Sequence, residues 1–346
     1  MNRKSIIILA VAILILASCE NPMRFETRVH ENGSLDKTIT FEKADSTVAI
    51  SNIFGINESK GWKVEITKLP QEDKSDKNSN PEFRIKLQKS FNSVEDINNE
   101  LDTPLDSLFH INSVFEKKFR WFYTYIRYTE TIRPINRFKL VSPEDYFNQE
   151  DQSFINRLPA EGTAISKADS LYLQVLNEKI SEYFTNTGIF KEEYKILEEV
   201  LKKNSVDQKW LDTLRKKQDF IFNHIDKMKG ETDFAAKMAD SLKIPLPKPS
   251  STRDFEEASK DFNSRLAFMK FARDGKYVNA IEMPWTVTNS NADSVSGNYL
   301  EWKPLVTKFI YKDYVMYAEC RHLNFWALVV SGVIVGITVL VFRWKR

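Results

Sequence analysis

Hydrophobic and polar positions alternate along the first part of the chain, as they do in β-strands that bury one face. Residues 25–29 and 35–41 alternate in this way on either side of the tetrapeptide ENGS, which begins at Glu31. Because Asn and Gly both tolerate positive φ angles, this stretch predicts a β-hairpin. The runs GWKVEI from Gly61 and EFRIKL from Glu82 predict two more strands, with a polar surface loop between them.

A capped helix and a long aromatic strand are expected next. Ser93 is followed by Asp96 three positions later, a spacing that predicts a short helix over SVEDINNEL. FEKKFRWFYTYIRYTETI, which begins at Phe115, alternates with a period of two and predicts one long strand packed on the core. Interleaved basic and aromatic residues also occur where proteins stack nucleic-acid bases, but the period of two favours the sheet. Another short helix is expected over 47–53.

Helical spacing replaces strand alternation from Ser142, where a cap residue precedes Pro143 at the first helical position. Two later helices, over 232–242 and 252–272, are separated by the proline-containing stretch IPLPKPSS. No fixed motif or period indicates a solenoid. The apolar stripes of the earlier helices are Leu171, Val175, Ile180 and Phe184, then Phe190, Tyr194, Leu197 and Leu201, then Trp210, Leu214, Ile221 and Ile225.

Strand patterns return after Gly275 in KYVNAIEMPWTV, YLEWKPL and KFIYKDYVMYAE. The sequence therefore predicts an α+β fold, in which an antiparallel β-rich module is interrupted by an all-helical insertion and followed by one transmembrane helix. The expected segments are a lipoprotein signal peptide at 1–18, the two halves of the β-rich module at 19–141 and 276–321, the helical insertion at 142–275, and the transmembrane helix with a short cytoplasmic tail at 322–346.

The C-terminal stretch from Leu323 to Phe342 contains no charged residue and is long enough to cross a bilayer as a helix. The basic residues of RWKR follow it, and such residues favour the cytoplasmic side, so the body is expected outside the cytoplasm. Within the span, Gly332 and Gly336 form a G-x-x-x-G motif that can let two helices approach closely. Glycine is common in membrane helices, so this motif indicates helix packing only weakly.

The N-terminus has the parts of a secretory signal, with basic residues at Arg3 and Lys4 ahead of an apolar run. The run ends in Leu-Ala-Ser-Cys, which resembles the bacterial lipobox, and predicts that Cys19 is lipidated and becomes the first residue of the mature protein. An uncleaved N-terminal anchor is the alternative. With a helical span at the other end, the expected location is the inner membrane with the body facing the periplasm or the outside. A body that bridges two membranes is the competing geometry.

Composition excludes several classes of function. The chain has 346 residues, with 50 Lys and Arg against 48 Asp and Glu, so no overall charge indicates nucleic acid as a partner. Its 10 glycines form no phosphate-binding motif. The two cysteines, Cys19 and Cys320, form no disulfide framework. Cys320 is expected to be a free thiol, although it could oxidise with a second copy.

Candidate chemistry is sparse, and we predict no catalytic residue, no cofactor and no metal site. The histidines, His30, His110, His224 and His322, lack a second ligand at the spacing of zinc sites. No serine lies in a G-x-S-x-G motif, so an enzyme is not expected. Three carboxylate pairs lie on predicted helices near lysines and are interpreted as solvated faces: Glu192 with Glu193, Glu198 with Glu199, and Glu256 with Glu257.

Six features follow one another along the chain: the lipobox, NGSL in the hairpin, GWKVEI, FNSVEDINNEL, MPWTVTNSNADSVSGNYLEW and the single C-terminal span. In this order they resemble the LppM-type membrane-anchored lipoproteins. The likeness covers 19–132 and 276–342, and the helical block has no counterpart. The resemblance implies a twisted sheet with helices on the outer side of the membrane, lipid or glycolipid as a ligand, and no catalytic residues.

The expected function is that of a membrane-anchored envelope lipoprotein whose body acts as a scaffold, sensor or partner-binding module. Its partners would be the membrane and an envelope protein. The alternative is binding or transfer of a lipid or glycolipid by the β-rich module, because aromatic strands beside a bilayer can line an apolar groove.

Overall fold

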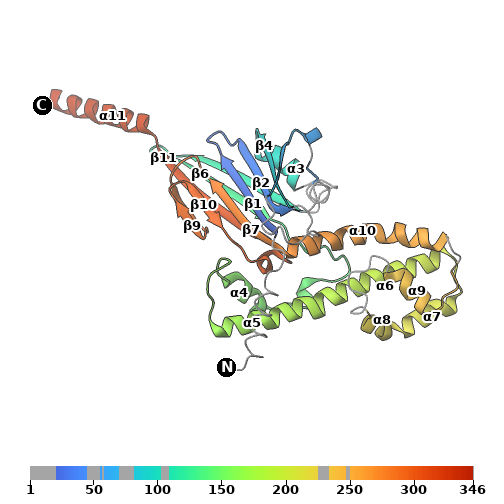
Figure 1. Cartoon of the computed structure of the whole chain (residues 1–346). Helices are drawn as coiled ribbons and strands as arrows, with labels where there is room; N and C mark the ends of the chain where they lie inside the picture. Colours follow the sequence, from blue (N-terminus) through green and yellow to red (C-terminus); the bar gives the residue numbers. More distant parts are fainter. Residues whose placement is uncertain are drawn as a thin grey trace. The chain divides into compact units, whose positions relative to one another are not determined.

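The computed structural model describes residues 21–44, 55–56, 58–69, 82–102, 109–224, 234–246 and 250–345. Cys19, the signal peptide and the expected helix over 47–53 lie outside the described residues. The chain divides into two compact units, a β-rich unit of Met1–Arg133 with Asp274–Arg346, and a helical unit of Pro134–Arg273. The fold is α+β, and most of its helices belong to the segment that separates the two halves of the β-rich unit along the chain (Figure 1).

Seven strands form the larger sheet, sheet A, in the order β3-β4-β2-β1-β7-β10-β9. β1 (Asn21–Val29) and β2 (Leu35–Ala44) form the predicted hairpin, and Gly33 in its turn has a φ of 89°. β1 pairs in parallel with β7 (Gly275–Glu282), and the other pairs of described strands in the sheet are antiparallel. The remaining strands are β3 (Lys63–Lys68), β4 (Phe83–Phe91), β9 (Ser294–Ser296) and β10 (Tyr299–Trp302).

The smaller sheet, sheet B, has the order β5-β6-β11-β8. The stretch predicted as one long aromatic strand is a hairpin, so that prediction is wrong. β5 (Ile111–Phe119) and β6 (Tyr123–Ile132) pair antiparallel across a tight turn in which the Arg120 N–H donates to the Tyr123 carbonyl at 2.8 Å. The turn residues Arg-Trp-Phe include no Gly, Asn or Pro, and so give no turn signal. The other strands are β8 (Val287–Ser290) and β11 (Tyr314–Leu323).

Aromatic side chains fill the core of the β-rich unit. The rings of Phe25, Phe109 and Tyr277 stack on one another with centroids 5.4 to 6.3 Å apart, and each is 1% exposed. The predicted helix is confirmed as α3 (Val94–Leu101), in which Ser93 Oγ accepts the Asp96 N–H at 3.2 Å. Short 3-10 helices lie at Glu58–Lys60 (η1) and Val306–Phe309 (η5).

The first apolar stripe predicted for the helical unit is only partly buried. A π-helical turn, Lys179–Thr185 (η3), joins α5 to α6, and Leu171 and Val175 of the expected stripe are 57% and 61% exposed. Leu176, Ile180 and Phe184 form the buried face instead. Leu171 precedes Ile180 by nine residues, which is two and a half α-helical turns, so the two side chains lie on opposite sides of the helix. The elements are η2 (Pro143–Asp145), α4 (Gln149–Arg157), α5 (Lys167–Glu178), α6 (Asn186–Lys203), α7 (Gln208–Lys216), α8 (Gln218–His224), α9 (Phe234–Ser241) and α10 (Ser250–Arg273).

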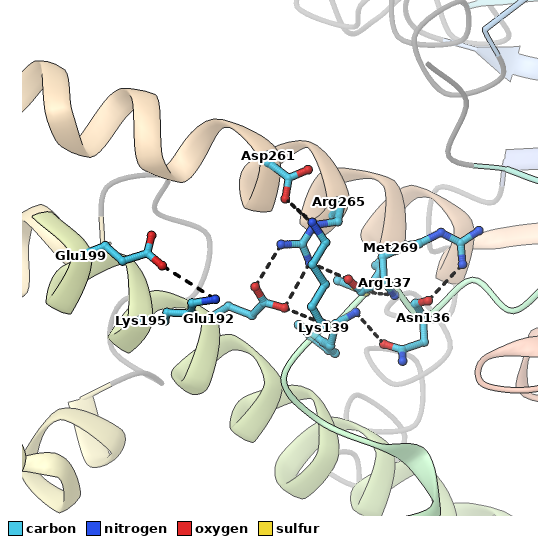
Figure 2. Close-up of polar contacts among 10 residues, drawn as sticks. Asn136, Arg137, Lys139, Glu192, Lys195, Glu199, Asp261, Arg265 and Met269 are labelled. Atoms are coloured by element: carbon cyan, nitrogen blue, oxygen red, sulfur yellow. Dashed lines mark hydrogen bonds and ion pairs between the residues drawn. The ribbon is translucent and has the colours of Figure 1, made fainter. Parts of the chain in front are cut away.

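Glu192 on α6 is buried, so the interpretation of Glu192 and Glu193 as a solvated pair is wrong. Figure 2 shows the reason. Arg265 on α10 donates to both Glu192 oxygens at 3.2 and 3.0 Å, and the Lys139 backbone N–H donates to the same carboxylate at 2.6 Å. Arg265 also donates to the Arg137 carbonyl. Three donors compensate the buried charge and fix the first segment of the helical unit to α6 and α10. Glu256 and Glu257 are exposed, as predicted.

The C-terminal helix α11 spans Phe325–Trp344 and follows β11 directly (Figure 1). It begins later than the apolar stretch does, because Leu323 still pairs with Tyr123 as the last residue of β11. The helix contains almost exclusively apolar residues, and of its 20 residues only Ala327 is buried. The helix is therefore long and apolar enough to cross a membrane.

Candidate functional site

The sequence singles out four residues, of which the structure describes Cys320, Gly332 and Gly336. Cys19 is outside the described residues. Gly332 and Gly336 lie on α11, and a Cβ added at either would meet no atom within 4 Å. The helix therefore presents this small-residue face openly. Cys320 is a free, buried thiol on β11, and burial raises its pKa to about 11, so it is poorly placed to oxidise with a second copy.

A buried polar cluster links the two sheets. The Lys37 ammonium on β2 lies 2.8 Å from both carboxylate oxygens of Glu130 on β6, and the side chains are 0% and 2% exposed. Thr27 Oγ1 accepts from Lys37 and donates to Glu130, each at 2.8 Å. The Tyr128 hydroxyl donates to Glu130 at 3.0 Å and is hydrogen-bonded to Ser113 Oγ. Burial and the Glu130 charge raise the pKa of Tyr128 well above its usual value. The cluster has the properties of a structural link between the sheets.

The outer face of sheet A carries rows of charged and polar side chains. Arg28 on β1 lies opposite Asp36 on β2 and opposite Glu282 on β7, and its guanidinium is 3.2 Å from the Glu282 carboxylate. Asp36 in turn accepts from Ser90 on β4 at 2.6 Å. Charges of alternating sign therefore cross three neighbouring strands, and opposite charges that face each other on adjacent strands stabilise a sheet.

A second row surrounds the small side chain of Ala280. In the strand register Ala280 lies opposite Glu26 on β1 and opposite Glu301 on β10. Arg24 connects the two carboxylates, at 3.0 Å from Glu26 and 3.3 Å from Glu301, and donates to the Tyr299 hydroxyl. The face is hollowed there. An open cavity of about 650 Å³ is lined by Glu26, Thr27, Arg28, Asp36, Lys37, Thr38, Gly61, Lys63, Gln88, Lys89, Ser90, Ala280, Glu282 and Tyr299.

Two carboxylates on this face are held in the charged form. The hydrogen bond from Ser90 lowers the pKa of Asp36, against partial burial, and His30 at 2.8 Å acts in the same direction. Burial alone would raise the pKa of Glu301, but hydrogen bonding to Lys303 and the charges of Lys303 and Arg24 lower it overall. The face therefore carries fixed charges of both signs at neutral pH.

This geometry suits a broad polar partner better than a small apolar ligand, whose sites are mostly apolar and enclosed. Among the residues that the structure describes, no group of three or more His, Cys, Asp or Glu side chains could hold a metal ion. The sequence alone did not predict the charged outer face of sheet A. The alternation of Arg24, Glu26 and Arg28 was visible, but their partners depend on the pairing of β1 with β7 from the far half of the chain.

No family model matches the chain, and no curated protein sequence matches it. Among solved structures, the chain is similar to the NMR structure of the folded domain of the Mycobacterium tuberculosis LppM protein. The sequences are 7% identical, the match covers 88% of this chain and 91% of that chain, and the TM-score is 0.27. This is a weak resemblance at the level of the fold.

Proposed function

We propose that the chain is a membrane-anchored protein of the bacterial cell envelope whose body lies outside the cytoplasm and binds a partner without catalysing a reaction. The apolar, largely unburied helix α11 supports the anchor. The basic residues that close the chain support a cytoplasmic tail. A lipid on Cys19 would supply a second anchor, in the same inner membrane.

The outer face of sheet A supports the partner-binding role. It carries both signs of charge in fixed rows, and it contains an open cavity of about 650 Å³. Charges arranged in this way select a partner with the opposite pattern and speed its association. A folded envelope protein with a complementary charged surface fits this face best.

The alternative, a lipid held inside the β-rich module, has less support. The aromatic side chains that would line such a groove are packed together in the core, where Phe25, Tyr277 and Trp302 are each at most 1% exposed. A core closed by stacked rings leaves no room along these strands for an acyl chain without repacking.

Photo-crosslinking in the native envelope tests the proposed face. A benzoylphenylalanine at Thr38, in the wall of the cavity, is expected to give one adduct of defined mass. The same group at Glu257, exposed on α10, is the control and is expected to give none of that mass. Failure to form an adduct at Thr38, or the same adduct at both positions, would contradict the proposal.

A charge swap makes the test specific for the pattern of charges. Arg28→Glu combined with Glu282→Arg keeps an ion pair between these two positions, since they face each other across β1 and β7. The fold is therefore expected to persist while the order of charges on the face is reversed, and the Thr38 adduct should disappear. An undiminished adduct in the swapped variant would show that the charge rows do not select the partner.

A further inference from the structure

Exposed aromatic side chains gather where the β5–β6 hairpin meets the start of α11. At the hairpin tip, Phe119, Trp121 and Phe122 are 58%, 46% and 43% exposed, and Trp326 on α11 is 49% exposed. The Phe119 and Trp326 rings stack with centroids 6.1 Å apart, and Trp121 packs edge-on against Trp326 at 5.3 Å. A contiguous exposed aromatic patch of this kind marks an interaction surface.

Basic side chains border the aromatic patch on the outer face of sheet B. An open cavity of about 520 Å³ is lined by Lys118, Arg120 and Arg127, together with Glu116, Tyr125, Ile126 and Glu319. Arg127 pairs with Glu319 at 2.7 Å, and Lys118 lies 3.9 Å from Glu116. Arg120 makes no ion pair with any residue that the structure describes. Lys117 and Arg321 add two further cationic groups beside the tip.

Asn324 joins the hairpin tip rigidly to the helix. Its side-chain amide donates to the Arg120 carbonyl at 2.8 Å and to the Trp121 carbonyl at 3.2 Å, and its carbonyl oxygen accepts from Thr124 at 2.8 Å. The Asn324 backbone N–H donates to the Phe122 carbonyl at 2.8 Å. Asn324 is 8% exposed, so these bonds are largely protected from water. The hairpin tip and the first turns of α11 therefore form one structural block.

The contacts also fix how far the tip reaches along the helix. Trp121 Nε1 donates to Ser331 Oγ at 2.9 Å. Ser331 lies about 9 Å along the axis from Phe325 at 1.5 Å per residue. If α11 crosses a bilayer, the tip must lie beside its first turns, at the depth of the headgroups and the outer acyl chains. Tryptophan is enriched at this depth because its ring is apolar and its N–H is polar.

We infer that the block formed by residues 119–122 and the first turns of α11 inserts into the outer interface of the membrane, where the adjacent basic residues bind anionic lipid headgroups. This inference rests on the proposed crossing of the membrane by α11. In addition to the anchoring by α11, insertion of the tip would hold the β-rich unit in a fixed orientation on the bilayer. The aromatic side chains would enter the interfacial region of the bilayer, and each basic residue near the anionic surface would strengthen the attachment of the tip to the membrane.

Depth-dependent quenching on the full chain tests the inference. In a Cys19→Ser background, Phe122→Cys is labelled with the fluorophore NBD, and the chain is reconstituted in vesicles of phosphatidylcholine and phosphatidylglycerol. Doxyl-labelled lipid is expected to quench this fluorophore. The matched control, Val295→Cys on β9, replaces another exposed apolar residue and should remain unquenched. Buried Cys320 should not react with the label.

Removing charge tests the headgroup contact. Lys118→Gln with Arg120→Gln should lower the ratio of inserted to free tip about fivefold for each charge removed, and only in vesicles that contain phosphatidylglycerol. Co-flotation with the vesicles reports insertion of α11 independently. A chain that does not float refutes the proposed anchor. A chain that floats with the Phe122 label unquenched, or shielded only by a second copy of the chain, refutes the interfacial block and leaves the anchor intact.

Discussion

Lys37→Met is expected to lower the melting temperature of the β-rich unit by about 10 °C, since leaving one partner of a buried ion pair alone costs about 3 to 5 kcal/mol. Lys37 and Glu130 are almost completely buried, and the methionine would leave the carboxylate with only hydroxyl donors. Thermal unfolding of the full chain in mild detergent, followed by near-ultraviolet circular dichroism, measures the effect.

The control is the same substitution on the outer face, Lys63→Met, where the side chain is 69% exposed and a change below about 1 kcal/mol is expected. The double variant Lys37→Met with Glu130→Leu should recover most of the loss, because no unpaired charge then remains in the core. A Lys37→Met protein that melts like the wild type would show that the cluster does not hold the sheets together.

Arg265→Met is expected to lower the free energy of unfolding of the helical unit by about 3 to 5 kcal/mol, because it leaves the buried Glu192 carboxylate without its charged partner. Glu192 would lose both guanidinium hydrogen bonds and keep only the donor from the Lys139 backbone. Hydrogen exchange followed by mass spectrometry should show faster exchange in peptides from α6 and from residues 134–141, with peptides from sheet A unchanged.

Arg215→Met on α7 removes the same charge from a side chain that is 55% exposed, and should leave exchange in α6 unchanged. Arg265→Lys should fall between the wild type and Arg265→Met, because a lysine cannot bind a carboxylate through two parallel hydrogen bonds. Equal exchange rates in Arg265→Met and Arg215→Met would contradict a stabilising role for the buried pair.

The sequence was most informative where local chemistry decides the structure. Asn-Gly in the first hairpin and the cap at Ser93 were predicted correctly, because a positive φ at Gly33 and a hydrogen bond to Ser93 depend only on neighbouring residues. The apolar helix α11 was also predicted correctly, because its length and composition are properties of that segment alone. The α+β class followed from the change of period between the segments.

The features that depend on contacts between distant parts of the chain were not predicted from the sequence. The β5–β6 turn was missed because Arg120 to Phe122 include none of the usual turn residues, and its closing contacts come from Asn324, far along the chain. Glu192 was placed at the surface because its partner, Arg265, lies on a different helix. The charge rows of sheet A could not be predicted either, because the order of the charges depends on which strands are neighbours in the sheet.

The most direct test of the membrane-anchored account is thiol labelling in spheroplasts of a bacterial host, in the Cys19→Ser background. Val295→Cys, exposed on β9, should react with a membrane-impermeant maleimide before the cells are lysed. Lys345→Cys, just beyond α11, should react only after lysis. Reaction at Lys345→Cys in intact spheroplasts, or protection of Val295→Cys until lysis, would contradict a body held outside the cytoplasm by α11.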